Sequence, residues 1–324
     1  ALYTPTYDAN GSFIGRHSSG GAPKVIKRQI LHDLTDAPTH TSVVSSHTVF
    51  NSRFLIEIGR GCARGCRFCS SGFISRPPRF RSVPALMTEI EKGREVADRI
   101  GLVGTAVSDL PGIASLCRQA YDMDVGLAFS SFRADAIDDA FIGALVKSDV
   151  KTATIAPDAG SERMRRVINK GLTQKEILRC TAALVSAGIA NLKLYFMVGL
   201  PTETEADVEA IVVLTEKIKQ VFLSESRPKG HMGNITVSLN CFVPKPFTPF
   251  QWAAMDQVAV LKKKIMVVRK GLSKIPNVVF RSESPRQASI QALLARGDRR
   301  IGQVLVAAHR FQGNWSRAMA DTGI

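Results

Sequence analysis

The sequence contains no apolar run long enough to cross a membrane. Its 324 residues are 45 % hydrophobic with a mean hydropathy of +0.03, which is enough for a substantial core. No uninterrupted apolar stretch approaches the ~18 residues that predict a spanning helix. The start, Ala1 to Pro5, shows neither an initiator Met nor a signal-peptide pattern. We therefore expect no membrane segment, and a chain that begins partway into a longer protein.

Cysteine is scarce and is not distributed as in a disulfide-stabilised secreted domain. Of the six cysteines, three cluster as C-x3-C-x2-C at Cys62, Cys66 and Cys69. The others occur singly, at Cys117, Cys180 and Cys241. This usage predicts a cytoplasmic protein in a reducing compartment, and the cluster has the spacing of ligands to an inorganic group.

Acidic residues are fewer than basic ones, with 28 Asp and Glu against 43 Lys and Arg and a net charge of +15. The net charge is +2 over residues 1–60, +4 over 61–100, +1 over 101–200 and +8 over 201–324. The excess beside the cysteines and in the last third could contact nucleic acid or another acidic partner, or form a solvated surface. No RNA-binding signature, repeat or low-complexity tract is present, so nucleic acid is possible but not favoured.

Apolar strand-like runs alternate with helical patterns from residue 53 onward. Strands are predicted at 54–56, 100–103, 125–129, 152–155, 192–198 and 235–239. Helices are predicted near 84–98, 111–121, 135–147, 160–169, 173–187 and 204–220. Thr173 with Glu176 forms a capping box, and Thr204 with Asp207 forms a weaker one. Six such units predict parallel strands in an open, partial (β/α)6 TIM-like barrel, an α/β fold with its chemistry at the strand C-termini.

Three segments are expected along the chain. Residues 1–50 read as an irregular N-terminal lead-in with one short strand at 24–26, and residues 51–245 as the barrel core. Residues 246–324 follow a proline-rich break and read as an α+β C-terminal extension packed on the barrel. In that extension we predict a helix at 251–274, a strand at 278–280 and then one or two helices, at 286–296 and 298–311.

Glycines surround the cysteine cluster. Gly59, Gly61 and Gly65 can adopt positive φ, which lets the loop curl so that three sulfurs converge. Three thiolates are one short of the usual four of a closed zinc or iron–sulfur site. A [4Fe–4S] cluster held by three thiolates leaves one iron open to a small molecule with an amine and a carboxylate. Zinc is the alternative, but none of the six histidines lies close in sequence.

A C-x3-C-x2-C motif with an aromatic before its last Cys, after the first strand of a βα series, resembles the radical S-adenosylmethionine (SAM) superfamily. Further strings, in order, resemble one functionally unassigned subfamily that carries an N-terminal cobalamin-binding-like domain. These strings are GRGCARGCRFCSSGFISRPPRFRS, APDAGSERMRRVINKG, LYFMVGLPTET, FVPKPFTPFQW and ARGDRR. Related groups are the methylthiotransferases and the cobalamin-dependent radical methyltransferases and cyclases.

The resemblance implies an oxygen-sensitive enzyme with two cofactors. Cys62, Cys66 and Cys69 would hold a [4Fe–4S] cluster, and SAM would chelate its open iron. One electron would then cleave SAM to methionine and a 5′-deoxyadenosyl radical that abstracts a substrate hydrogen. A reductase such as flavodoxin or ferredoxin would donate the electron.

Cobalamin-assisted methyl transfer is the final reaction that the resemblance favours. No D-x-H-x-x-G cobalamin-ligand pattern occurs, so a cobalamin domain would lie upstream of Ala1. One alternative is an RNA-modifying, methylthiotransferase-like enzyme, although the dispersed cysteines offer no second cluster. The other is a non-catalytic Fe–S or Zn protein that binds nucleic acid through its basic last third.

The resemblance also implies SAM contacts after the second and third strands. Where the family commonly has Gly-Gly-Glu, this chain has Gly104 and Thr105, and Ser108 or Asp109 could replace the acid. An ordinary strand-to-helix turn is the alternative. After the third strand, Arg133 could pair with the SAM carboxylate, or equally with Asp135 or Asp138.

Further SAM contacts are implied after the first, fourth and fifth strands. Asp158 stands where the family has Glu and could instead cap the next helix, Ser161 would offer a hydroxyl, and Lys170 matches a basic position that grips the carboxylate. Val198 and Gly199 would lie against the adenine. Phe68 could cover the cluster or the adenine.

A group of arginines and a single cysteine near the barrel mouth each allow more than one interpretation. Arg76, Arg79 and Arg81 could hold an anionic substrate, a partner domain or a cobalamin tail, or form a solvated face. Cys241, after the sixth strand, could donate a hydrogen atom in catalysis, although a passive buried thiol is favoured. The sequence identifies no other catalytic residue.

Overall fold

The structure, a computed structural model, describes residues 2–23, 25–48, 50, 52–230 and 232–324. Its internal contacts divide the chain into two compact units. The larger unit is Asp33–Ser289, and the smaller unit combines Ala1–His32 with Ile290–Ile324. The domain boundaries expected at residues 50 and 245 remain predictions.

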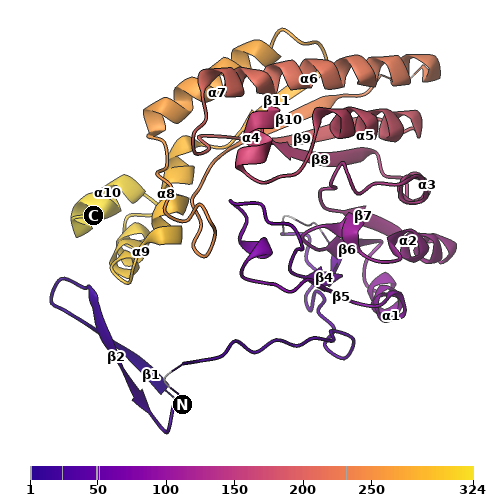
Figure 1. The fold of residues 1–324 in the computed structure, drawn as a ribbon. Helices are drawn as coiled ribbons and strands as arrows, with labels where there is room; N and C mark the ends of the chain where they lie inside the picture. Colours follow the sequence, from indigo (N-terminus) through magenta and orange to yellow (C-terminus); the bar gives the residue numbers. More distant parts are fainter. Residues whose placement is uncertain (1, 24, 49, 51, 231) are drawn as a thin grey trace. The chain divides into compact units, whose positions relative to one another are not determined.

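The larger unit is built on two sheets of parallel strands (Figure 1). The first has the order β3-β6-β7, with β3 (Phe54–Glu57), β6 (Arg99–Val103) and β7 (Gly126–Phe129). The second has the order β11-β10-β9-β8, with β8 (Thr152–Asp158), β9 (Asn191–Val198), β10 (Ile235–Cys241) and β11 (Val278–Ser282). A parallel bridge between Phe132 and Ile155 links the sheets, which do not close. The predicted α/β fold with a partial barrel is confirmed.

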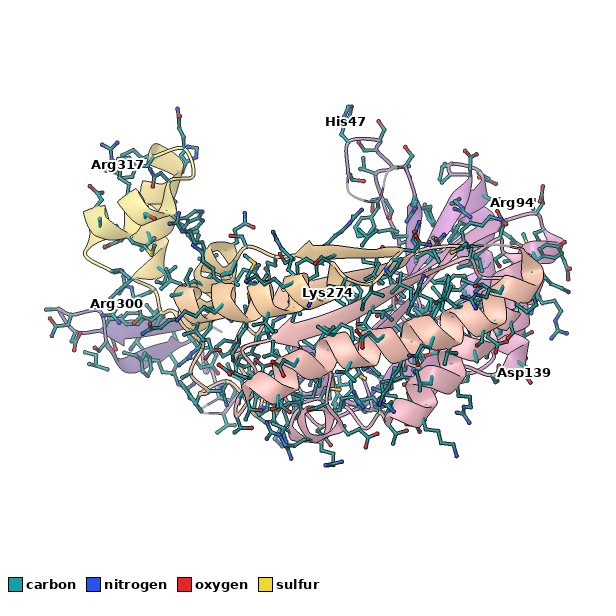
Figure 2. The ribbon with its side chains drawn as sticks, turned by 90° about the horizontal axis from the view of Figure 1, so that it is seen from above. His47, Arg94, Asp139, Lys274, Arg300 and Arg317 are labelled. Atoms are coloured by element: carbon teal, nitrogen blue, oxygen red, sulfur yellow. The ribbon has the colours of Figure 1, made fainter. Side chains whose placement is uncertain are left out.

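Helices follow the strands in the predicted alternation. They are α1 (Val83–Arg94), α2 (Ile113–Asp122), α3 (Asp139–Lys147), α4 (Glu162–Val167), α5 (Gln174–Ser186), α6 (Glu205–Ser226) and α7 (Val258–Leu272). Both predicted capping boxes are present, because Thr173 and Thr204 each exchange hydrogen bonds with the third helical residue. Helices α6 and α7 pack alongside each other, as the view from above shows (Figure 2).

Strands β9 and β10 each have one buried face and one partly open face. On β9, the fully buried side chains of Leu192, Leu194 and Phe196 alternate with the half-buried Lys193 and Tyr195. Strand β10 alternates in the same way. Because successive side chains point to opposite faces, the buried face meets the helices and the other faces the inside of the half-barrel. The inner face of the second sheet is therefore polar.

The structure extends the barrel beyond the six predicted strands. Strand β11, expected in the C-terminal extension, pairs in parallel with β10 as a seventh strand. Helix α7 begins at Val258 and not at residue 251. The reason is that the chain before it is held by another contact, in which the Phe250 N–H donates to the Arg67 carbonyl at 3.2 Å.

The smaller unit contains a hairpin that the sequence pattern did not predict. Strands β1 (Leu2–Tyr7) and β2 (Phe13–Ser19) pair antiparallel, and Gly11 adopts a φ of +81° in the turn. The strand predicted at 24–26 is wrong for Val25 and Ile26, which lie outside any strand, while Lys24 is outside the described residues. After α8 (Pro285–Arg296), which crosses the unit boundary, helices α9 (Ile301–Arg310) and α10 (Trp315–Thr322) share a small core.

Among the described residues, no helix has both the length and the apolar character that crossing a membrane requires.

Candidate functional site

The cysteine loop is closed at its base by a short antiparallel pair, β4 (Gly59–Arg60) with β5 (Arg79–Phe80). Gly61 follows β4 with a φ of +83°, and a Cβ there would lie 2.2 Å from the Ser75 carbonyl oxygen. The Thr105 hydroxyl, after β6, donates to the Gly61 carbonyl at 2.6 Å. Only glycine meets both the φ and the close approach, so Gly61 fixes the entry to the loop.

We expect Gly61→Ala to destabilise the protein by at least about 2 kcal/mol, from backbone strain together with the clash at Ser75. Because the clash displaces the start of the loop, iron bound after anaerobic reconstitution should also fall. Denaturant unfolding and iron analysis measure the two effects. The matched control is Gly188→Ala, whose φ is +103° but whose Cβ would meet no atom within 4 Å. Equal losses of stability and of iron in both variants would contradict this role.

A second set of bonds ties the cysteine loop to the segment after α4. The Arg67 N–H donates to the Ile168 carbonyl at 2.9 Å, and its guanidinium donates to the Val167 carbonyl at 2.6 Å. The Asn169 amide donates to the Gly65 carbonyl at 2.8 Å. These bonds bring the cysteines next to the segment that ends at Lys170.

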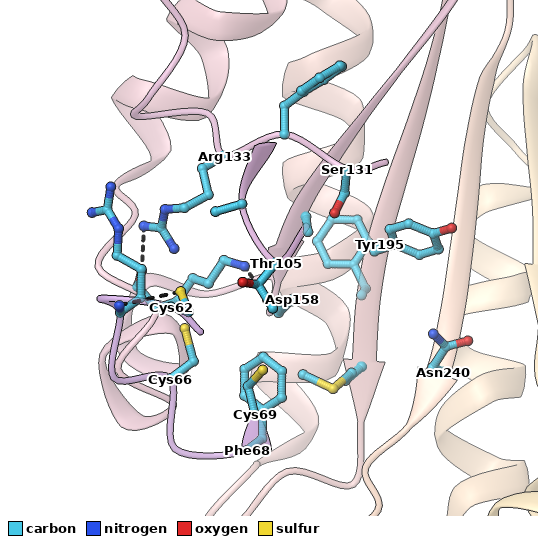
Figure 3. A pocket seen from close by; sticks show the side chains of 17 residues that line it. Cys62, Cys66, Phe68, Cys69, Thr105, Ser131, Arg133, Asp158, Tyr195 and Asn240 are labelled. Atoms are coloured by element: carbon cyan, nitrogen blue, oxygen red, sulfur yellow. Dashed lines mark hydrogen bonds and ion pairs between the residues drawn. The ribbon is translucent and has the colours of Figure 1, made fainter. Parts of the chain in front are cut away.

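The three cysteines line one pocket of about 450 Å³ at the C-terminal ends of the strands (Figure 3). The pocket also brings together five of the predicted contact residues, Phe68, Thr105, Arg133, Asp158 and Lys170. In Figure 3 the cysteines lie on one side of the cavity, and Tyr195 and Asn240 lie on the other. The volume is that of a small-molecule site.

The three thiols of the pocket differ in burial. Cys66 is buried, Cys62 and Cys69 are half-buried, and all three are free. Burial raises the pKa of the Cys66 thiol, although the positive charge of Lys170 opposes this. In a [4Fe–4S] cubane each thiolate binds a different iron, so the three thiols of this pocket can serve as its ligands.

Asp158 and Lys170 form a buried ion pair beside the thiols. The Lys170 ammonium lies 2.5 Å from Asp158 Oδ2, and each residue is 8 % exposed. Asp158 ends β8 with a φ of +63°, a left-handed conformation that is unusual outside glycine. The helix-cap alternative for Asp158 is wrong, because Ser161 is the N-cap of α4.

Arg133 and Arg64 form the charged wall of the pocket with two carboxylates. Arg133 pairs with Asp135 through two bonds of 2.9 Å and donates to the Lys170 carbonyl at 3.0 Å. Arg64 lies 3.4 Å from both Asp109 and Asp135. Burial tends to raise the pKa of Asp135, but the bonds and charge of Arg133 outweigh it and lower that pKa. The wall therefore contains fixed, ionised groups in a preorganised arrangement.

The structure does not bring every predicted contact residue to the pocket. Gly104 packs against Ile58, whose side chain would lie 2.8 Å from an added Cβ. The Ser108 hydroxyl is buried and has no hydrogen-bond partner among the described residues. The Ser161 hydroxyl accepts from the Met164 N–H at 3.0 Å and donates to Asp207 at 2.6 Å.

Val198, Gly199 and Cys241 also lie away from the pocket lining. Val198 is fully buried on the helix-facing side of β9, and Gly199 packs against Leu261. Cys241 follows the pocket residue Asn240 on β10 and therefore points to the opposite face. Burial raises the pKa of Cys241 to about 11, as expected of a passive thiol.

The arginines that follow the cysteine loop bond chiefly to backbone carbonyls. Arg76 donates to the carbonyls of Ala63 and Cys62, and Arg79 to those of Pro77 and Ser75. Arg81 is 3 % exposed and bonds to Glu57. Neither a solvated face nor a substrate site describes Arg81, whose position in the interior was not predicted.

Tyr195 and Asn240 are pocket residues that sequence reasoning missed. Both occupy inner-face positions of their strands and line the pocket. The alternation along residues 191–198 carried the signal, because buried leucines at 192 and 194 place residue 195 on the opposite face. This strand was predicted from the sequence, but only Val198 of residues 192–198 was assigned to the site.

Fold and site together define a class of protein: a parallel α/β half-barrel whose strand ends hold a three-thiolate cluster pocket. The model of the radical SAM superfamily matches residues 56–214, a range that begins in β3 and contains all three cysteines. The match identifies a radical SAM domain in this chain, and members of the radical SAM superfamily bind a [4Fe–4S] cluster and SAM.

The chain is also similar to individual proteins. It is 37 % identical over 263 residues to an uncharacterized protein of Methanocaldococcus jannaschii, covering 81 % of this chain and 56 % of that one. It is 25 % identical over 232 residues to a tRNA-2-methylthio-N(6)-dimethylallyladenosine synthase of Sulfurovum, covering 64 % and 52 %. The crystal structure of Streptococcus suis SuiB bound to S-adenosylmethionine matches with a TM-score of 0.52 at 12 % identity, covering 71 % and 49 %.

These coverages show that the chain spans about half the length of the curated relatives it matches. The SuiB likeness, at its low identity, shows the fold alone.

Proposed function

We propose that the protein is a radical SAM enzyme that cleaves SAM reductively and abstracts a hydrogen atom from a substrate. The observation that carries the proposal is the convergence of Cys62, Cys66 and Cys69 on one pocket with the Asp158–Lys170 pair. The three thiols would hold the cluster. When bound and reduced, a [4Fe–4S] cluster supplies the electron that breaks the C5′–S bond of SAM, giving methionine and a 5′-deoxyadenosyl radical.

The residues around the thiols would bind and orient SAM. Lys170 and Arg133 are the buried cations of the pocket that could face its carboxylate, although each is already paired with an aspartate. Phe68 and Met197 give an apolar surface for the adenine. Thr105 lines the pocket where the family has its amino-group contact. Gly104, Ser108, Ser161, Val198 and Gly199 stay predictions, and they would act through the backbone or by supporting the pocket.

Anaerobic reconstitution tests the proposal. The purified chain is treated with iron and sulfide, reduced with dithionite and incubated with SAM, and 5′-deoxyadenosine is measured by mass spectrometry. We expect 5′-deoxyadenosine above that of a reaction without dithionite. Its absence from protein that carries a full complement of iron and sulfide would overturn the proposal.

A second candidate is a methylthiotransferase-like enzyme acting on RNA. It is supported by the similarity to the Sulfurovum tRNA-modifying synthase and by the net charge of +15. The other cysteines do not support it. Burial raises the pKa of Cys117 and of Cys180 to about 12, and the two lie singly on α2 and α5. Iron analysis tests this candidate, because a second three-cysteine cluster in the chain would bind iron in addition to that held by Cys62, Cys66 and Cys69.

Four expectations from the sequence keep the status of predictions. Cobalamin-assisted methyl transfer would require a cobalamin-binding domain, and no described residue bears on it. Flavodoxin or ferredoxin as electron donor and sensitivity to oxygen follow from the family. A cytoplasmic location follows from the composition.

A further inference from the structure

The inner face of strands β9, β10 and β11 carries two cations, Lys193 and Arg281, beside the cofactor pocket. Strand register places Tyr195 beside Ser238, and Ser238 beside Arg281. Tyr195 lines the pocket, so all three side chains lie on the inner face. Phe280, the neighbour of Arg281, contacts Arg269 of α7 on the outer face, which confirms the direction of Arg281.

The second cation, Lys193, lies two residues before Tyr195 on β9, on the same face of the strand. Its ammonium lies 4.8 Å from the centre of the Tyr195 ring, so the side chain leans along the strand toward the pocket. Register places Thr154 of β8 and Thr236 of β10 on either side of Lys193. Strands lie about 4.8 Å apart and residues about 3.3 Å apart along them, so the Cα atoms of Lys193 and Arg281 are about 12 Å apart. Two long side chains can reach one small anion across that separation.

Neither cation is neutralised within the described part of the chain. No ion pair joins Lys193 or Arg281 to any described carboxylate, whereas Lys170, Arg133 and Arg64 of the upper wall are all paired. Glu283 is the nearest acid in sequence on this face, and its carboxylate accepts from the Cys241 N–H at 3.3 Å. Lys193 is half-buried and Arg281 is exposed, so both are accessible to a ligand.

The surrounding side chains add hydroxyl groups. Thr154, Thr236 and Ser238 lie on the inner face and are half-buried, and no described residue hydrogen-bonds to their hydroxyls. The cations Lys193 and Arg281, beside several hydroxyl donors, have the chemistry of an oxyanion site. Because this surface is continuous with the pocket wall at Tyr195, a molecule held here extends into the pocket.

We infer that the inner face of β9–β11 is a substrate subsite. There Lys193 and Arg281 bind an oxyanion group, either a carboxylate or a phosphate, of the molecule that reacts in the pocket. The inference rests on the proposed function only in taking the pocket as the place of reaction. Lys193 and Arg281 would hold the anionic end of the substrate and leave its other end beside SAM. Specificity then depends on the distance between the anion and the reacting carbon.

The test measures anion binding to the purified 324-residue chain without SAM or reductant. Inorganic phosphate and, separately, acetate are titrated and followed by ³¹P and ¹³C NMR relaxation. We expect saturable binding of at least one anion, and the tighter of the two identifies the group on the substrate. Lys193→Gln or Arg281→Gln should weaken it about tenfold, since each removes a charge-assisted hydrogen bond, while Arg281→Lys should retain part of it.

The matched control is Arg269→Gln, which removes the same charge from the outer side of β11. It should bind the anion as the unchanged protein does. Equal weakening in Arg269→Gln and Arg281→Gln, or no saturable binding of either anion, would overturn the inference. The titration requires neither cluster nor SAM, so a failure of SAM cleavage would leave its result intact. Circular dichroism confirms that each variant is folded.

Discussion

Replacing Cys62, Cys66 and Cys69 together by Ala is expected to abolish both the cluster and SAM cleavage. The three thiols line one pocket and are free, so they are the ligands that the cluster has available. Without them the reconstituted protein should lack the broad absorbance at roughly 400 nm that iron–sulfur thiolate ligation gives. Absorbance, bound iron and 5′-deoxyadenosine should all fall to background.

The control for this variant is Cys241→Ala. Cys241 is buried on the opposite face of β10, so its removal should leave cluster absorbance unchanged. Retained absorbance in the triple variant, with loss in Cys241→Ala, would move a ligand to Cys241. The triple variant should stay folded, because hydrogen bonds at Gly61 and Asn169 hold the loop independently of the thiols. Circular dichroism checks this.

Lys170→Met is expected to reduce both stability and SAM binding. The substitution leaves the Asp158 carboxylate buried without its cation, which costs about 3–5 kcal/mol of unfolding free energy. The double variant Asp158→Asn/Lys170→Met removes both charges. It should therefore be more stable than the sum of the two single losses indicates. Denaturant unfolding of the four proteins measures this coupling, and equilibrium dialysis of the reconstituted proteins measures SAM affinity.

Lys175→Met provides the control, because Lys175 is exposed near the start of α5. Its stability should change by less than about 0.5 kcal/mol. Single losses that simply add in the double variant would show that Asp158 and Lys170 do not act as a pair. Unchanged SAM affinity in Lys170→Met would separate the pair's structural role from cofactor binding.

The strands and helices of the barrel could be predicted because their patterns are local. The apolar alternation of residues 191–198 and the capping residues Thr173 and Thr204 act within one element, and each is present in the structure. The β1–β2 hairpin was missed because its side chains are mostly exposed, so no apolar alternation marks it. Its clearest local sign is the turn glycine, Gly11.

The site was predictable only where one short motif defines it. Three closely spaced cysteines indicated the cluster. The pairing of Arg133 with Asp135 was one of several possible pairings, and only the folded chain decides among them. The interior position of Arg81 depends on carbonyls far away in sequence, which no local pattern reports. The Lys193–Arg281 surface likewise exists only through the register of three strands.

Product stoichiometry tests the central claim most directly. Reconstituted protein is incubated anaerobically with SAM and dithionite, and methionine and 5′-deoxyadenosine are quantified together over time. The account predicts that both appear in equal amounts, that both require dithionite, and that both are absent from the triple cysteine variant. Formation of neither product by the cluster-loaded protein, or of methionine without 5′-deoxyadenosine, would contradict it.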